Sequence, residues 1–152
     1  MKTMICNESK IFYFQAAIVE HLLLLTEEER ELRFFKSMNE FQIREWVETL
    51  DKKEAEFVLL LDDEDNLKGF GQVSVCRAME ISGDLSLSLD KSVRGQGNGF
   101  KLFRQLLQTA KKIKLDKLHI MFKSNNFPVK ALVLKFGFQL SYDFGDVAGV
   151  ML

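Results

Sequence analysis

The stretch SVRGQGNGFKLF, residues 92–103, places three glycines at alternate positions, 95, 97 and 99, directly after Arg94. The whole chain has only nine glycines. Alternate glycines remove the side chains from a short segment of backbone, so a large ligand can approach it closely. This loop is therefore the first candidate for a ligand site, although the same glycines are also compatible with a purely structural turn.

The segments on either side of the loop predict a strand before it and a helix after it. GDLSLSLD, residues 83–90, alternates strictly between an apolar face and a face that carries serine. After the loop, apolar residues recur at helical spacing, so we expect a helix to begin near Gly97. Its predicted apolar face consists of Phe100, Phe103, Leu107 and Ala110.

A strand, a glycine-rich turn and a helix together favour the binding of an anion. The first N–H groups of a helix have no intrahelical acceptor, and they carry the positive end of the helix dipole. Glycine lets a phosphate touch that backbone, and Arg94 adds a forked donor of permanent charge. The pattern therefore indicates a pyrophosphate.

Two common phosphate-binding loops are excluded. A Walker A loop needs Gly-Lys-Ser/Thr, but Phe100 follows Gly99. A dinucleotide-binding loop needs a third glycine at position 100 and an acidic residue at the end of the next strand, whereas Asp116 precedes that strand. The pattern that remains is R-x-x-G-x-G, formed by Arg94, Gly97 and Gly99.

Length and composition limit the class of protein. The chain has 152 residues and 17.6 kDa, is 47% hydrophobic and carries a net charge of −1, so we expect one domain, residues 1–152, and no nucleic-acid partner. No apolar run reaches the ~20 residues of a membrane span, and we expect no signal peptide. Cys6 and Cys76 are isolated and no histidine cluster exists, so we expect no metal site and a cytoplasmic location.

The remaining sequence predicts a mixed α/β protein. Thr26 with Glu29 forms a capping-box pattern at a helix start, and residues 39–50 have one apolar helical face. Residues 9–18 are compatible with a first strand or with a helix. Two apolar runs within 56–78 form a predicted hairpin. Further segments are a strand at 117–123, a helix at 125–138 that begins around Pro128 and ends at Gly137, and strands at 138–144 and 147–152. This order predicts a mixed central sheet flanked by helices.

The loop and the segment after it resemble the GNAT superfamily of N-acetyltransferases. The family places R-x-x-G-x-G between an alternating strand and a long helix, and follows it with N-x-x-[AM]-x-x-L-x-x-K-x-G-F. This chain has Asn126, Val129, Leu132, Lys135 and Gly137-Phe138 at that spacing, with a mild change at Val129. The resemblance covers residues 55–152 well. Residues 21–35 are more loosely similar to the acyltransferase domains of bacterial protein acetylases.

The resemblance implies a GNAT fold and transfer of an acetyl group from acetyl-CoA to an amine. It implies that the backbone of Leu87, Ser88 and Leu89 pairs with the pantetheine arm, and that a backbone N–H near Leu89 stabilises the oxyanion. The other residues that it assigns to the cofactor are Arg94, Gly95, Gln96, Gly97, Asn98, Gly99, Asn126 and Lys135.

Acetyl transfer also needs a base for the amine and benefits from an acid for the thiolate. Asp84 opens the alternating strand where many relatives carry glutamate, so it is the first candidate base, with Glu80 next and a role in the turn beside Gly83 as the alternative. Relatives often place a tyrosine acid where this chain has Val133. Tyr142 or water would have to replace it. We expect His21 and His119 to be structural.

The charge pattern agrees with an anionic cofactor but leaves the acceptor open. Residues 101–135 contain nine Lys and Arg and one Asp, a net +8, which would attract a phosphorylated ligand. Residues 26–56 are acidic, which would favour a cationic amine if they border the acceptor site. The resemblance implies a small-molecule amine or a protein amine as the acceptor, and a homodimer is left open. The competing hypothesis is a non-catalytic module of the same fold that binds acyl-CoA.

Overall fold

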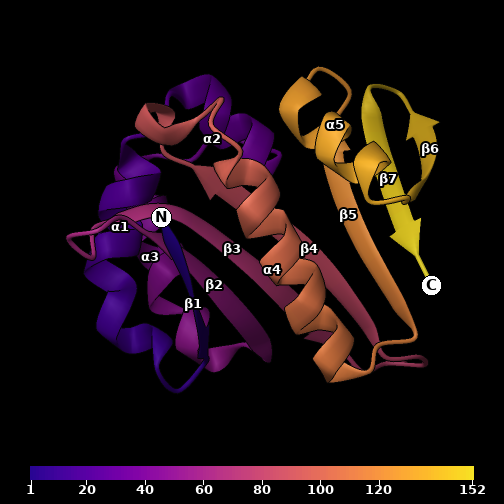
Figure 1. Ribbon diagram of the computed structural model, residues 1–152, viewed down its shortest axis with the longest axis horizontal. Helices are drawn as coiled ribbons and strands as arrows, with labels where there is room; N and C mark the ends of the chain where they lie inside the picture. Colours follow the sequence, from indigo (N-terminus) through magenta and orange to yellow (C-terminus); the bar gives the residue numbers. More distant parts are fainter.

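A seven-stranded mixed sheet with the order β1-β2-β3-β4-β5-β7-β6 runs through the molecule (Figure 1). The computed structural model describes residues 1–152. Neighbouring strands are antiparallel, except for the parallel pair β4 and β5. The strands are β1 (Lys2–Asn7), β2 (Ala55–Leu61), β3 (Leu67–Cys76), β4 (Ser82–Leu89), β5 (Lys117–Lys123), β6 (Gln139–Asp143) and β7 (Asp146–Met151).

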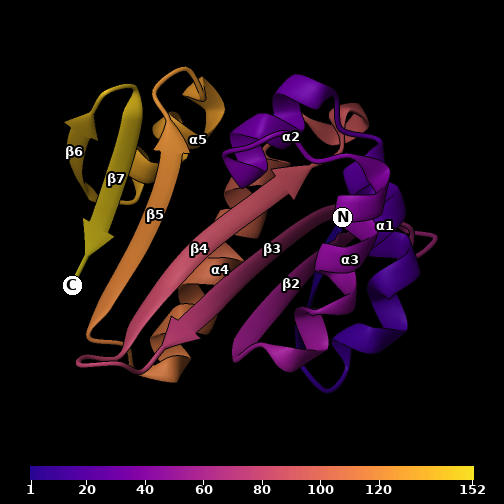
Figure 2. The same ribbon diagram turned by 180° about the vertical axis from the view of Figure 1, so that it is seen from behind.

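Helices cover both faces of this sheet. The N-terminal helices α1 (Gln15–Leu23), α2 (Glu27–Phe34) and α3 (Glu40–Glu48) lie on one face, and α4 (Asn98–Ile113) crosses the other (Figures 1 and 2). The helix α5 (Phe127–Lys135) lies beside α4 and connects β5 to β6. Short 3₁₀ helices span Ile11–Phe14, Leu50–Lys52 and Lys91–Val93. No helix is long and apolar enough to span a membrane.

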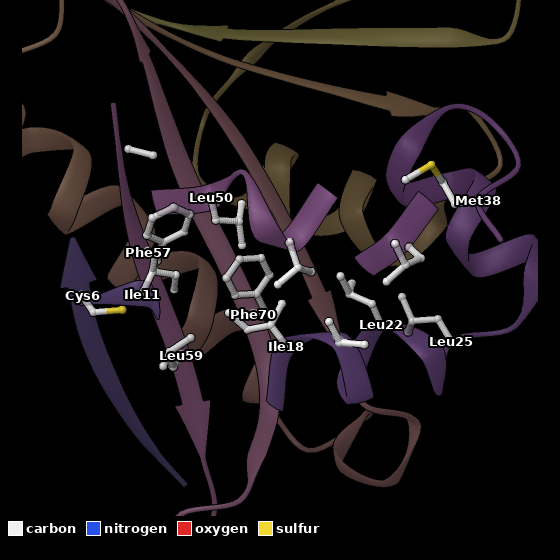
Figure 3. Packing of buried hydrophobic residues seen from close by; sticks show 14 of the residues in the cluster. Cys6, Ile11, Ile18, Leu22, Leu25, Met38, Leu50, Phe57, Leu59 and Phe70 are labelled. Atoms are coloured by element: carbon white, nitrogen blue, oxygen red, sulfur yellow. The ribbon is translucent and has the colours of Figure 1, made fainter. Parts of the chain in front are cut away.

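The two faces of the sheet carry two separate hydrophobic clusters. In the first, Ile18 and Leu22 of α1 pack toward Phe57 and Phe70, whose stacked rings lie 5.9 Å apart (Figure 3). In the second, α4 lies very close to the sheet, because a Cβ added at Gly71 would be only 2.7 Å from the side chain of Leu106. This close packing fixes the position of α4, and therefore of the loop that precedes it.

The predicted elements are confirmed, with two corrections. The strand β1 was not predicted, and residues 9–18, which the sequence left open, contain a 3₁₀ turn and the start of α1 rather than a strand. The buried face of α4 includes Leu102 and Leu106, whereas Phe100 is only half-buried. The predicted capping box at Thr26 is formed, and α3 has a second one at Asn39.

The parallel strands β4 and β5 separate along their length. Their pairing runs from Ser82 opposite Lys117 to Leu85 opposite Ile120 and then stops. Beyond this point β4 points toward α2 and β5 toward α5 (Figure 2). Residues 86–89 of β4 therefore pair with β3 on one side and have no neighbouring strand on the other.

Candidate active site

A cleft of about 600 Å³ lies where β4 and β5 separate. Its walls come from α2, the exposed edge of β4, the glycine loop, β5 and α5. The residues that line it include Glu29, Arg33, Ser86, Leu87, Ser88, Leu89, Arg94, Gly95, Gly97, Gly99, Phe100 and Asn126. The glycine loop and the end of β4 thus line the same cleft.

The edge of β4 offers free backbone groups to this cleft. Asp90 donates its N–H to the carbonyl of Lys68 next to β3, at 2.8 Å. Backbone groups of alternate residues in an antiparallel pair point to the same side. The backbone N–H and C=O groups of Ser88 therefore point toward β3, whereas the N–H groups of Leu87 and Leu89 point toward the gap. An extended ligand placed there would complete the sheet by one strand.

The glycine loop presents bare backbone at the start of α4. Gly95 and Gly97 have φ values of +72° and +81°, and no atom lies within 4 Å of a Cβ built on either one. The first intrahelical bond of this turn runs from the Lys101 N–H to the Gly97 carbonyl, so the N–H groups of residues 98–100 precede the hydrogen-bonded helix. The open space and free donors fit a pyrophosphate.

Two residues of the loop that were predicted to contact the cofactor do not line the cleft. Asn98 is buried and donates from Nδ2 to the Val93 carbonyl at 2.9 Å. Gln96 is exposed and reaches the Ser92 carbonyl at 3.4 Å. Their side chains brace the turn, so only their backbone could contact a ligand in the cleft.

Arg94 lines the cleft but already has partners. Its Nε and Nη2 donate to the Leu89 carbonyl at 3.0 and 2.8 Å, and its Nη1 forms an ion pair with Glu29. This pair and the hydrogen bonds to Thr26 hold the pKa of Glu29 below its ordinary value, although burial opposes the shift. Arg94 therefore joins the end of β4 to the first turn of α2.

The two predicted contacts from α5 differ in position. Asn126 lines the cleft just before α5. Lys135 is at the other end of the helix and does not line the cleft, although its Nζ lies 4.6 Å from the centre of the ring of Phe100, which does. Asn126 and Lys135 are far apart because the eight helical residues between them extend over about 12 Å.

The candidate bases lie toward the other end of β4. Asp84 is exposed and does not line the cleft, but it shares a face of β4 with Ser86, two residues or about 7 Å further along the strand. Glu80 precedes β4 and forms an ion pair with Lys117 at 3.3 Å. Glu80, like Asp84, does not line the cleft, and its role as the second candidate base stays a prediction.

No tyrosine lines the cleft. Val133, at the position of the tyrosine acid in many relatives, is fully buried in the second hydrophobic cluster. Tyr142 is exposed on β6, with Lys130 over its ring. Neither side chain can protonate a leaving group in the cleft directly.

His21 has a contact that the sequence did not reveal. It is buried on α1, and its Nε2 lies 2.8 Å from Oγ of Ser88 on β4, while its buried Nδ1 has no partner. Burial lowers the pKa of His21 to about 4, against the opposing effect of Asp90. The ring is therefore neutral at pH 7 and fixes Ser88 at the rim of the cleft.

The basic residues of 101–135 do not converge on the cleft. The helix α4 starts at the glycine loop and runs about 24 Å across the sheet (Figure 1). Lys111, Lys112, Lys114 and Lys117 consequently lie near the far end of the sheet, around the start of β5. The net charge of this segment overstates the potential at the site. No group of three or more His, Cys, Asp or Glu side chains is placed to hold a metal ion.

Comparison with known proteins gives a family and a fold. The sequence matches the model of the acetyltransferase (GNAT) family over residues 18–138. No curated protein matches it.

The solved structures that are similar include the GNAT domain of S. lividans PAT, with a TM-score of 0.78, 9% identity and coverage of 98% of this chain and 89% of that chain. Ribosomal-protein-alanine N-acetyltransferase from Brucella melitensis has a TM-score of 0.70, 17% identity and coverage of 100% and 99%. A phosphinothricin acetyltransferase from Sinorhizobium meliloti, solved in complex with AcCoA, has a TM-score of 0.69, 17% identity and coverage of 99% and 88%.

Proposed function

Because this chain belongs to the acetyltransferase (GNAT) family, we propose that its β4–β5 cleft holds acetyl-CoA beside an amine and transfers the acetyl group to that amine. The observation that carries this proposal is the combination of an unpaired β4 edge with bare backbone at the start of α4. One feature suits the extended pantetheine arm and the other suits the pyrophosphate. We treat residues 1–152 as one catalytic domain, since both hydrophobic clusters pack on the same sheet.

The residues proposed to hold acetyl-CoA follow from the cleft. The backbone of Leu87 and Leu89 pairs with the pantetheine arm, and Ser88 is held between them by His21. The backbone of residues 95–99 binds the pyrophosphate. Asn126 contacts the ligand from the side of α5. Arg94 contributes a positive charge while it remains bonded to the Leu89 carbonyl.

The chemical step needs little from the side chains of this chain. Acetyl-CoA supplies the acetyl group as a reactive thioester. A backbone N–H near Leu89 that points toward the gap, that of Leu87, donates to the carbonyl oxygen on which negative charge develops, since Leu89 adjoins the loop for the pyrophosphate at the other end of the arm. Asp84 lies on the same face of β4 as Ser86, about 7 Å from it, and accepts the amine proton through a chain of water molecules. With Val133 in the tyrosine position, water rather than a side chain protonates the thiolate.

Two measurements test this function. Calorimetry with acetyl-CoA should show binding to one site per chain. An assay of thiol release across a panel of amines, with detection of the acetylated product, should show turnover. Binding without turnover of any amine would favour the non-catalytic acyl-CoA module, for which the buried Val133 is the supporting observation. The absence of binding would contradict both functions.

The acceptor class and location belong to the same proposal. The family acts on amines, and the cleft has space on the α2 side of β4 for an acceptor. We place the protein in the cytoplasm, because Cys6 and Cys76 are free thiols, as expected in a reducing compartment.

A further inference from the structure

Arg33 on α2 lines the cleft with a guanidinium that has no partner. Its Nε and Nη2 are buried, and neither forms a hydrogen bond. Burial lowers the pKa of Arg33 to about 10, and no carboxylate offsets the effect. Leaving buried donors without acceptors costs free energy, so they are normally satisfied.

The surroundings of Arg33 hold the guanidinium without neutralising it. Its central carbon lies 4.9 Å from the centre of the Phe34 ring and 5.4 Å from that of Trp46. Aromatic faces attract a cation but accept no conventional hydrogen bond from its N–H groups. The arginine is thus held in place with donors still free.

Among the charged side chains that line the cleft, Arg33 is the one whose charge is not balanced by an opposite charge. The ionisable side chains that line it are Glu29, Arg33 and Arg94. Glu29 is paired with Arg94, which leaves the charge of Arg33 uncompensated. Of the four clustered glutamates in residues 27–31, only Glu29 lines the cleft, so these helices bring no unpaired negative charge to it for a cationic acceptor.

The position of Arg33 assigns it to the acceptor rather than the cofactor. The glycine loop and α5 form the wall for acetyl-CoA, whereas α2 lies over the upper end of β4 on the opposite face of the sheet (Figure 2). Ser86 and Ser88 point to this same face, as the contact between Ser88 and α1 shows. A ligand on this side would place polar groups between Arg33 and the two serines.

We propose that the acceptor is a free amino acid, whose carboxylate is bound by Arg33 while its amine faces the exposed edge of β4. This rests on the proposed acetyl transfer in the same cleft. The amine nitrogen forms a bond to the acetyl carbon and the carbon–sulfur bond breaks; the amine proton passes through water to Asp84, and the coenzyme A thiolate leaves and takes a proton from water. A planar guanidinium matches a carboxylate with two parallel hydrogen bonds.

The variant that tests this is Arg33→Met, with Arg30→Met as the matched control. Arg30 is on the same helix, but its guanidinium donates to the carbonyls of Leu25, Met38 and Leu23 at 3.2, 3.0 and 3.4 Å. The Arg30→Met variant therefore loses three hydrogen bonds to backbone carbonyls that stabilise the fold. Removing Arg33 deletes a charge whose Nε and Nη2 are buried without a partner, and methionine keeps the apolar contact with the rings.

The first readout is unfolding by urea without ligand. Arg33→Met should be at least as stable as the parent, whereas Arg30→Met should unfold at a lower urea concentration. The second is kcat/KM with acetyl-CoA for the twenty amino acids and for their carboxamides. The parent should prefer the acid over its amide by about 10-fold or more, the effect of one charge-assisted pair. Arg33→Met should bring this ratio close to one, while the KM for acetyl-CoA stays unchanged and Arg30→Met keeps the parent ratio.

Three results would overturn the proposal. They are an unchanged ratio in Arg33→Met, a loss of stability in Arg33→Met equal to that in Arg30→Met, and acetylation confined to amines without a carboxylate. If no amine reacts, calorimetry of the same amino acids against the protein with coenzyme A decides: binding lost in Arg33→Met supports the proposal, and no binding rejects it. Failure of acetyl-CoA itself to bind would instead reject the proposed function.

Discussion

At the scale of single residues, Gly97 is required for its backbone and, on our proposal, for the ligand. Its φ of +81° is unfavourable for other residues, and the space where a Cβ would lie is the space for the pyrophosphate. Gly97→Ala should lower stability by about 1–2 kcal/mol and weaken acetyl-CoA binding about 10-fold or more. Gly137 is the matched control, since it has φ +83° and open space but is away from the cleft. Gly137→Ala should lose similar stability and bind acetyl-CoA normally. Equal binding by the two variants, measured by calorimetry, would make the loop structural.

Asp84 provides the second test at this scale. Asp84→Asn keeps the size of the side chain but removes the base, so kcat should fall on the order of 10²-fold at neutral pH. Acetyl-CoA affinity should hardly change, because Asp84 does not line the cleft. The defect should shrink as pH rises and more amine is neutral. Glu80→Gln, at the ion pair with Lys117, should retain the parent rate. A pH–rate profile of Asp84→Asn parallel to that of the parent would assign Asp84 to the turn.

His21 should make stability depend on pH. Burial lowers its pKa from 6.5 to about 4 in the folded protein, so the unfolded chain binds more protons between these values. Stability should therefore be unaffected above pH 6.5 and decrease as pH falls toward 4, by up to about 3 kcal/mol from this group. The His21→Gln variant should lack the decrease in stability at low pH that His21 causes. Urea unfolding at pH 7 and pH 4.5 measures the difference. The same pH dependence in both proteins would show that His21 is accessible to protons when folded.

Some of these residues could be predicted from sequence and some could not. The glycine loop was predictable because its spacing, its arginine and its flanking elements are local features. Arg33 was not, because Glu29 and Arg33 are four residues apart on a helix and would be expected to pair with each other on the surface. The structure instead pairs Glu29 with Arg94, 65 residues away, and only that long-range contact leaves Arg33 free.

At the scale of elements, α2 depends on polar contacts at its start and along its length. None of its residues is fully buried, and its start is fixed by the capping box of Thr26 and Glu29. Thr26→Ala should cost about 1 kcal/mol and should increase hydrogen exchange locally in α2. Because α2 carries Arg33, the KM for the acceptor should rise several-fold while acetyl-CoA affinity changes little.

The second capping box supplies the control. Asn39 caps α3, whose Ile43 and Val47 are buried in the first hydrophobic cluster. Asn39→Ala should lose a comparable amount of stability, yet the KM for the acceptor should not change. A rise in acceptor KM in both variants would mean that general destabilisation, not the position of α2, sets this constant.

Elements with a regular apolar pattern were predicted well, and those defined by distant partners were not. The alternation of β4 and the helical spacing after Gly97 are contained in adjacent residues. The strand β1 is an edge strand whose Met4 and Ile5 are exposed, and it is defined by pairing with β2 about fifty residues later. The apolar face of α4 was misplaced toward Phe100 because glycines at 69 and 71 of β3, rather than any feature of the helix, bring Leu102 and Leu106 against the sheet.

At the scale of the whole molecule, the site exists because two parallel strands separate. Each strand belongs to a different half of the sheet, since β4 is joined to β3 and β5 to β7. The first helices cover one face and α4 the other, so neither closes the gap between the strands (Figures 1 and 2). The cleft therefore joins the two faces, which lets a donor and an acceptor approach the same strand edge from opposite sides.

This arrangement predicts how the folded protein should respond to acetyl-CoA. A ligand that binds only the folded state adds about 2.7 kcal/mol of stability at a concentration of 100 times Kd. For a chain of this length that corresponds to a rise in Tm of about 5–10 °C. Acetyl-pantetheine, which lacks the phosphates but can pair with the β4 edge, should give a much smaller rise at the same concentration. Equal rises would mean that the glycine loop contributes nothing to binding.

The salt dependence of acetyl-CoA affinity should distinguish binding by the glycine loop from long-range attraction by the positive charge of residues 101–135. If the net +8 of residues 101–135 acted together, acetyl-CoA affinity would fall steeply with added salt. In the structure, four of those lysines lie near the far end of the sheet, beyond the ~10 Å over which charge acts at 0.1 M salt. We therefore expect affinity to fall by less than about 10-fold between 0.05 and 0.5 M sodium chloride, and acetyl-pantetheine binding to be unaffected. Replacing Lys111, Lys112 and Lys114 together by glutamine should leave that salt dependence unchanged. A triple variant with a flatter salt dependence would show that the end of α4 attracts the cofactor from a distance, and that the site extends beyond the cleft.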